Sequence, residues 1–194
     1  MSLYLPEPPP EGMQLINAAL GNLLGQPTST QLAMADANPD NLVAAAPHHV
    51  YFASLESVAG GQMLAQVEMT GWRYIVLDDE RPLVAVNLDI NADEGKLEFS
   101  SANQGVLVEG TLEAVRIAES LDDVSAENFE LRLLEVPSLY VIALWLHGEY
   151  KDLLIPLPTS NQKLEPFGVY TEQRLLTAIR GMAVRQLRFS EENV

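Results

Sequence analysis

The residues best able to do chemistry lie in one short loop, from His147 to Asp152. It contains one of the chain's three histidines, and Glu149 follows two residues later. A histidine beside a carboxylate can act as a general base or as a metal ligand. The spacing of His147 and Glu149 is similar to the H-x-E of zinc deaminases, but a chain without cysteine lacks their other ligands. His147 and Glu149 are therefore candidate catalytic residues, and the alternative is a polar strand end.

A second candidate is a basic stripe on the last predicted helix. Arg174, Arg185 and Arg188 fall within about 60° of one another on a helix of 100° per residue, opposite its apolar stripe. Such a stripe is typical of a site for an anionic ligand or an acidic partner. The alternative is a solvated face whose arginines pair with acids of the same chain.

A third candidate is a cation site at Asp89, Asn91 and Asp93, whose spacing resembles the start of a calcium loop. The resemblance then ends, because glycine comes one place late, at Gly95, and the twelfth position is Ser100. A hairpin turn with Gly95 in a left-handed conformation explains the same residues. No metal is therefore expected, and these three residues are the candidates if there is one.

The remaining motifs argue against common enzyme classes. His48 and His49 are neighbours on a predicted strand, so their side chains point to opposite faces and cannot easily chelate one ion. The sequence contains no G-x-S-x-G nucleophile elbow, no Walker loop and no G-x-G-x-x-G motif. We expect no cofactor, and a non-enzymatic protein is favoured over an enzyme.

The clearest predicted element among those that must position these residues is the longest apolar run of the chain. Leu139–Leu146 is unbroken, and a second run, Leu153–Leu157, follows the histidine loop. Apolar runs bounded by turn residues are typical of strands that are covered on both faces. The pattern predicts a hairpin at the centre of the fold, with residues 147–152 as its connection.

The other elements complete an α+β fold with a mostly antiparallel sheet of about six strands in hairpins and meanders, and with helices at both termini. Helices are expected at residues 13–24, 111–121 and 171–187, the last two capped by Thr111 and Thr171. A short helix at 42–46 is expected to end at Pro47. Further strands are expected at residues 48–52, 72–77, 82–90, 97–99 and 129–133. Residues 1–46 form a proline-rich arm with an uncharged helix, and residues 47–194 form a single α+β domain.

The net charge of the chain restricts the kinds of partner that it can bind. The chain carries 27 acidic and 11 basic residues, a net charge of −16. Nucleic-acid phosphates and anionic lipid repel such a surface, so neither a nucleic acid nor a membrane is expected as a partner. The longest apolar run has eight residues, against the ~18 of a membrane span. The N-terminus lacks the features of a signal peptide, so a soluble, cytoplasmic protein is expected.

Three functional hypotheses follow. The first is a non-enzymatic interaction or assembly protein that binds a protein partner or self-associates through residues 1–46, because the predicted N-terminal helix is uncharged. The second is a small-ligand binder or an enzyme with its site near the His147 loop. The third is an acidic secretion-type chaperone, by analogy of fold class and charge alone.

Overall fold

The structure is a computed structural model that describes residues 3–24, 37, 41–158 and 160–192. The chain divides into two compact units. The first unit comprises residues 1–4, 50–69 and 110–194, and the second comprises residues 5–49 and 70–109. The boundary expected between residues 46 and 47 lies inside a strand, β2 (Leu42–Phe52).

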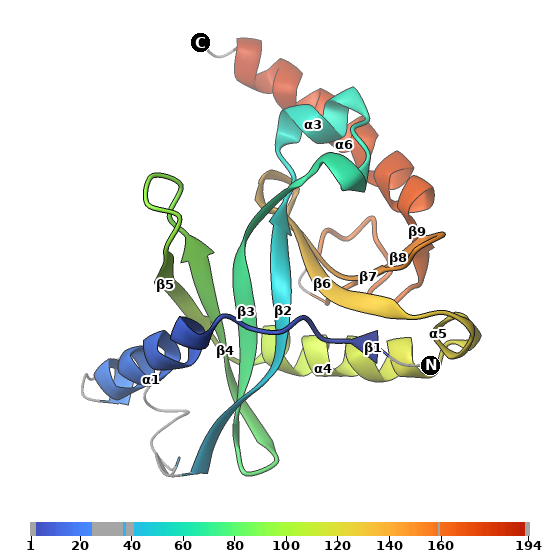
Figure 1. The fold of residues 1–194 in the computed structure, drawn as a ribbon. Coiled ribbons are helices and arrows are strands. Elements are labelled where there is room, and N and C mark those ends of the chain that lie inside the picture. The colour runs from blue at the N-terminus through green and yellow to red at the C-terminus, as the bar shows by residue number, and fades with distance from the viewer. Residues whose placement is uncertain (1–2, 25–36, 38–40, 159, 193–194) are drawn as a thin grey trace. The chain divides into compact units, whose positions relative to one another are not determined.

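The first unit is built on an antiparallel series of strands in the order β6-β7-β8-β9, with β1 parallel to β6 (Figure 1). These strands are β1 (Leu3–Tyr4), β6 (Phe129–Val136), β7 (Val141–His147), β8 (Asp152–Pro156) and β9 (Tyr170–Thr171). Its helices are α3 (Leu55–Gly60), all but the first turn of α4 (Val106–Glu119), α5 (Asp122–Ala126), α6 (Glu172–Glu192) and the short 3-10 turns η2 (Leu64–Gln66) and η3 (Pro137–Leu139). The last residues of β2 adjoin β6, where Ala53 N donates a hydrogen bond to Glu135 O.

The predicted hairpin lies in the core of this unit. Trp145 on one face of β7 and Leu144 and Leu146 on the other are all buried, so the expectation of a strand covered on both faces is confirmed. The apolar stripe of α6 packs into the same core through Leu175, Ile179 and Ala183. Burial of a large apolar side chain is worth roughly 1.5–3 kcal/mol, so this stripe fixes α6 to the unit.

The second unit contains strands in the order β5-β4-β3-β2, of which β3, β4 and β5 are antiparallel. Its elements are α1 (Pro10–Leu24), β2, β3 (Glu68–Asp78), β4 (Arg81–Ile90), β5 (Leu97–Asn103) and the first turn of α4 (Val106–Glu119). Helix α1 buries Gly12, Ile16, Ala19 and Leu20, which recur at helical spacing. Gly12 is required there, because a Cβ would lie 2.4 Å from the Tyr74 hydroxyl oxygen.

The α+β class and the mostly antiparallel pairing are confirmed, and the part of the chain that the structure describes has nine strands rather than about six. The predicted helix at 42–46 is wrong, because those residues extend β2 through Pro47. A run of five residues is too short to hold a helix alone. Ala46 has φ of 48°, an irregularity in the strand directly beside the proline.

Of the two predicted helix caps, Thr171 is confirmed and Thr111 is wrong. Thr171 Oγ1 accepts a hydrogen bond from Arg174 N at 3.3 Å, so the predicted cap of α6 is confirmed. The predicted cap at Thr111 is wrong, because α4 begins at Val106 and Thr111 is buried within it. Gly105, with φ of 70°, precedes this helix and accepts from Val108 N and Glu109 N.

Within the described residues, no helix has both the length and the apolar character needed to cross a membrane.

Candidate functional site

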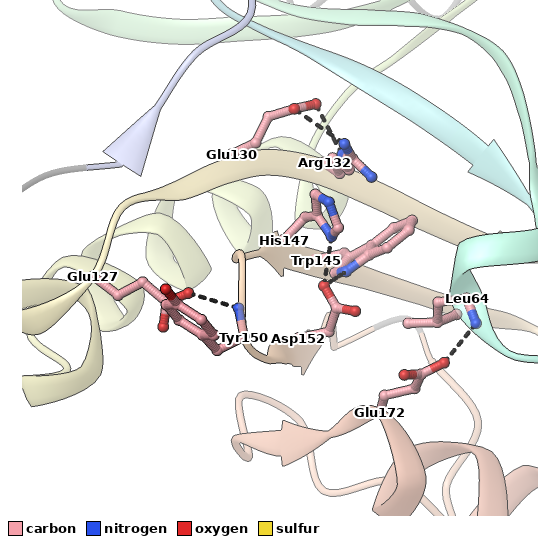
Figure 2. Close-up of polar contacts among 9 residues, drawn as sticks. All are labelled: Leu64, Glu127, Glu130, Arg132, Trp145, His147, Tyr150, Asp152 and Glu172. Atoms are coloured by element: carbon pink, nitrogen blue, oxygen red, sulfur yellow. Dashed lines mark hydrogen bonds and ion pairs between the residues drawn. The ribbon is translucent and has the colours of Figure 1, made fainter.

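The polar cluster at the end of the central hairpin comes from three neighbouring strands. Register places Glu130 of β6 opposite His147 of β7, and His147 opposite Asp152 of β8. In the next row of the same face, Arg132 lies opposite Trp145. Side chains that lie directly opposite one another in antiparallel strands share one face, so the five residues form one patch (Figure 2).

Asp152 is the centre of this cluster. Its Oδ1 accepts from Trp145 Nε1 at 2.8 Å and lies 2.8 Å from His147 Nδ1. A carboxylate only accepts hydrogen bonds, so the His147 tautomer that fits carries its proton on Nδ1. That tautomer leaves Nε2 of His147 as an acceptor. The His147 side chain is 39% exposed and that of Asp152 is 17% exposed, which is the arrangement of a general base oriented by an acid.

Arg132 is held by its neighbours on both sides. Its Nε and one terminal nitrogen donate to the two Glu130 carboxylate oxygens at 2.8 and 3.0 Å. Its guanidinium also lies 4.9 Å from the ring centre of Tyr51 and 5.0 Å from that of Trp145. Burial raises the pKa of Tyr51, and the positive charge of Arg132 partly opposes this rise. Two of its donor nitrogens are occupied by Glu130, so Arg132 orders the side chains of the patch and is not an open site for an anion.

The loop between β7 and β8 is tied to the segment around α5. Glu127 Oε1 accepts from Tyr150 N at 3.1 Å, and Lys151 forms an ion pair with Asp123. Gly148 is buried beneath this contact, and a Cβ there would lie 2.6 Å from the same Glu127 oxygen. The loop is therefore anchored by both polar contacts and close packing.

The two predicted catalytic candidates differ in their surroundings. His147 has Asp152 as its partner, whereas Glu149 is exposed in the loop. Sequence reasoning did not single out Asp152. The available signal was its position, because residues 147 and 152 flank a four-residue connection and must pair if the hairpin forms.

The predicted arginine stripe lies on the exposed face of α6. Arg174, Arg185 and Arg188 are all exposed. Among the side chains that the structure describes, none of the three has a carboxylate within ion-pair distance. Arg174 instead lies 4.6 Å from the Tyr170 ring centre and reaches the Val169 carbonyl at 3.4 Å. The stripe therefore keeps its positive charge at the surface.

Arg180, the remaining arginine of α6, has a structural role that the sequence did not indicate. Its Nε donates to the carbonyl of Ala59 at 3.0 Å, near the end of α3. Gly61 follows with φ of 77° and its N–H bonds back to Ser57 and Val58 carbonyls. A cation near a helix C-terminus interacts favourably with the last carbonyl groups of that helix. Arg180 of α6 therefore stabilises the end of α3 and holds the two helices together.

The predicted cation loop forms a closed turn between β4 and β5. Asn91 Oδ1 accepts from Asp93 N and Glu94 N at 2.9 and 3.1 Å, and Asn91 Nδ2 donates to Glu98 at 2.9 Å. Gly95 has φ of 64°, as a left-handed turn residue. The Asn91 side chain, one of the three candidate calcium ligands, is thus already hydrogen-bonded within the turn. Asp89, the first candidate ligand, is the register partner of Glu98 in the β4–β5 ladder.

His48 and His49 belong to the second unit. His48 is fully buried, with Nδ1 2.7 Å from the Ala46 carbonyl, while the His49 ring contacts that of Trp72 at 4.1 Å. Burial, reinforced by the nearby positive charge of Arg73, lowers the pKa of His48 to about 3. His48 is therefore neutral across the physiological range.

Among the described residues, no group of three or more histidine or acidic side chains is arranged to hold a metal ion. Comparison with protein-family models, with curated proteins and with solved structures gave no match.

Proposed function

We propose that this chain is a protein-interaction module that binds an acidic segment of a partner protein through the exposed face of α6. The observation that carries the proposal is the exposure of Arg174, Arg185 and Arg188 and their lack of a carboxylate partner within the described part of the chain. They are exposed, and none of the carboxylates whose side chains the structure describes pairs with them.

The local charge of α6 is opposite to that of the chain. Residues 173–190 contain four arginines and no acid, a charge of +4 in a chain of net charge −16, and the acids of α6 lie at its two ends, at Glu172, Glu191 and Glu192. A localised positive face attracts an acidic segment and raises its association rate. The acidic remainder repels a nucleic acid, which is charged at every phosphate along its length, more than a short acidic segment, and this favours a protein as the source of negative charge.

The packing of α6 also supports a docking role. Leu175, Ile179 and Ala183 are fully buried in the first unit, so the helix is held while its opposite face stays exposed. Phe189 is 65% exposed and lies about 40° around the helix from Arg185. A face that combines cations with an aromatic ring fits a segment that alternates acidic and apolar side chains.

A fluorescent peptide of aspartate, glutamate and leucine tests this proposal by fluorescence anisotropy. The chain with Arg174→Gln, Arg185→Gln and Arg188→Gln should bind it at least tenfold more weakly than the unaltered chain. Binding should also weaken from about 0.01 M to about 0.15 M salt, as the Debye length falls from roughly 30 to 8 Å. Equal affinity for the triple variant would overturn the proposal.

Self-association remains the other form of this function, with α1 as its contact. The apolar stripe of α1 is used inside its own unit, but its exposed face, which includes Met13, Asn17 and Ala18, carries a single charge, that of Glu11 in the first turn. In a chain of net charge −16 such a face repels a second copy least. Light scattering should detect an oligomer that Met13→Lys with Asn17→Lys disperses and that Gln173→Lys on α6 does not. A monomer for the unaltered chain would exclude this contact.

The second candidate function is a small-ligand site or an enzyme that uses His147 as a general base. The His147–Asp152 pair supports it, because Asp152 fixes one ring nitrogen and leaves the other as an acceptor. A metabolite screen by thermal shift should then find a ligand that stabilises the unaltered chain and the Glu149→Ala variant but not His147→Ala. A screen with no such ligand would count against this function.

A further inference from the structure

A small pocket of the first unit lies beside α3, and its lining includes none of the residues of the His147 patch or of the arginine stripe. It has a volume of about 180 Å³ and is lined by Phe52, Ser54, Ser57, Gln62, Gln66, Val67 and Glu68. The lining comes from the end of β2, from α3 and from the segment through η2 that leads into β3. All of these residues belong to residues 50–69, so the pocket is contained in one compact unit.

Two side chains of α6 hold the walls of this pocket in place. Glu172 accepts a hydrogen bond from Leu64 N at 2.5 Å and so fixes η2 (Figure 2). Arg180 fixes the other wall through the Ala59 carbonyl. Ser54 caps α3 by accepting from Ser57 N at 3.1 Å. A site whose walls are already ordered loses less conformational entropy when it binds a ligand.

Several donors of the lining are already used within the chain. Ser57 Oγ donates to the Ser54 carbonyl at 2.8 Å, and Gln62 Nε2 donates to the Gln66 carbonyl at 2.8 Å. Among the described residues, the acceptors of the lining that no hydrogen bond uses include the Gln62 side-chain oxygen and the Glu68 carboxylate. The lining contains no lysine or arginine, and Glu68 is its one acidic side chain. Phe52, which is 40% exposed, and Val67 supply an apolar wall.

We propose that this pocket binds a primary ammonium group on an aliphatic stem. The ammonium donates to the Glu68 carboxylate and the Gln62 oxygen, and the stem packs on Phe52 and Val67. An ammonium has three donors and no acceptor, which matches a lining of acceptors. An aromatic face also attracts a cation. The Arg180 guanidinium lies against Gly61 and does not line the pocket.

The volume of about 180 Å³ restricts the guest to a small group such as one ammonium on a short stem. Pockets for nucleotides and other drug-sized ligands span roughly 300–1,000 Å³. The same chemistry can come from a lysine side chain of a partner protein or from a free diamine. This inference does not depend on the acidic-partner function of α6.

Titration followed by ¹⁵N–¹H NMR of the full chain tests the proposal with three probes: N-acetyl-lysine methylamide, the matching norleucine compound without the ammonium, and cadaverine. The lysine compound should shift the amide signals of Ser57, Gln62 and Gln66 in a saturable way, and the norleucine compound should not. Glu68→Gln should weaken binding about tenfold, because it removes a charge-assisted hydrogen bond. Glu56→Gln, an exposed acid of α3 outside the lining, is the matched control and should leave binding unchanged.

The relative affinities identify the source of the ammonium. Tighter binding of N-acetyl-lysine methylamide assigns the pocket to a lysine of a partner, and tighter binding of cadaverine assigns it to a free diamine. Equal shifts with the norleucine compound, or no saturable shift with either ammonium probe, would overturn the proposal without affecting the α6 function.

Discussion

His147 and Asp152 face each other across the last paired position of the β7–β8 hairpin, with Nδ1 2.8 Å from Oδ1. The same Asp152 oxygen accepts from the buried Trp145 indole at 2.8 Å. One carboxylate therefore satisfies a donor in the core and a donor at the surface. This links the packing of the hairpin to the orientation of the one histidine in its loop.

Loss of the Asp152 carboxylate should destabilise the chain more than loss of His147. Asp152→Ala leaves the indole N–H of Trp145 without this acceptor in a buried position, which costs roughly 1–3 kcal/mol in free energy of unfolding. His147→Ala removes a side chain that is 39% exposed and should cost less than about 1 kcal/mol. Urea denaturation followed by tryptophan fluorescence measures both. Equal unfolding midpoints for Asp152→Ala and the unaltered chain would contradict the role given to Asp152.

The histidine loop should be intolerant of a single methyl group. In Gly148→Ala the new Cβ would lie 2.6 Å from a Glu127 oxygen and 2.8 Å from the Lys151 carbonyl, so the loop must shift. Such overpacking typically costs about 1–3 kcal/mol. Gly181→Ala on the exposed face of α6 is the matched control, since no atom lies within 4 Å and alanine favours a helix by roughly 0.5–1 kcal/mol. The account fails here if thermal unfolding ranks the two variants in the opposite order.

The pH dependence of stability should carry a contribution from His48. Its folded pKa of about 3 is below the ordinary 6.5. As pH falls below 6.5 the unfolded chain takes up this proton before the folded chain does. The stabilising contribution is thus complete above pH 6.5 and is lost as pH falls towards 3. One histidine gives about 2 kcal/mol of lost stability between pH 7 and pH 5.

His48→Gln isolates this contribution, because glutamine keeps a polar side chain that does not titrate. Its free energy of unfolding should change by about 2 kcal/mol less than that of the unaltered chain between pH 7 and pH 5. His49→Gln, on the neighbouring residue, is the control and should retain the original dependence. Parallel stability curves for all three proteins would show that His48 is not the titrating group.

The hairpin was predictable from the sequence because burial on both faces leaves a direct trace. Every residue from Leu139 to Leu146 is apolar, and β7 covers this run from Val141 onward. The predicted start is two residues early, because Leu139 belongs to η3 and Tyr140, in a left-handed conformation, is 77% exposed. The cap at Thr171 was predictable for a similar reason, since a hydroxyl before an apolar helical stripe is a local signal. The segment 42–46 was not, because a short run of alanines has no period that separates a helix from a strand.

The site was only partly predictable. The exposed arginines of α6 could be placed on one face by counting residues, because helical periodicity is regular. The contacts of Asp152 with Trp145, and of Arg180 with Ala59, depend on tertiary packing. Arg180 and Ala59 are 121 residues apart, so no sequence spacing indicates their contact.

The central claim is that α6 presents its arginine face to an acidic partner segment. Backbone amide NMR of the full chain, titrated with the acidic leucine-containing peptide, tests where that peptide binds. The account predicts the largest shifts on the exposed face of α6, around Arg174, Gly181 and Arg185, and their loss in the triple arginine variant. Saturable shifts confined to other elements, or an unchanged spectrum at about 0.01 M salt, where electrostatic attraction extends roughly 30 Å, would contradict it.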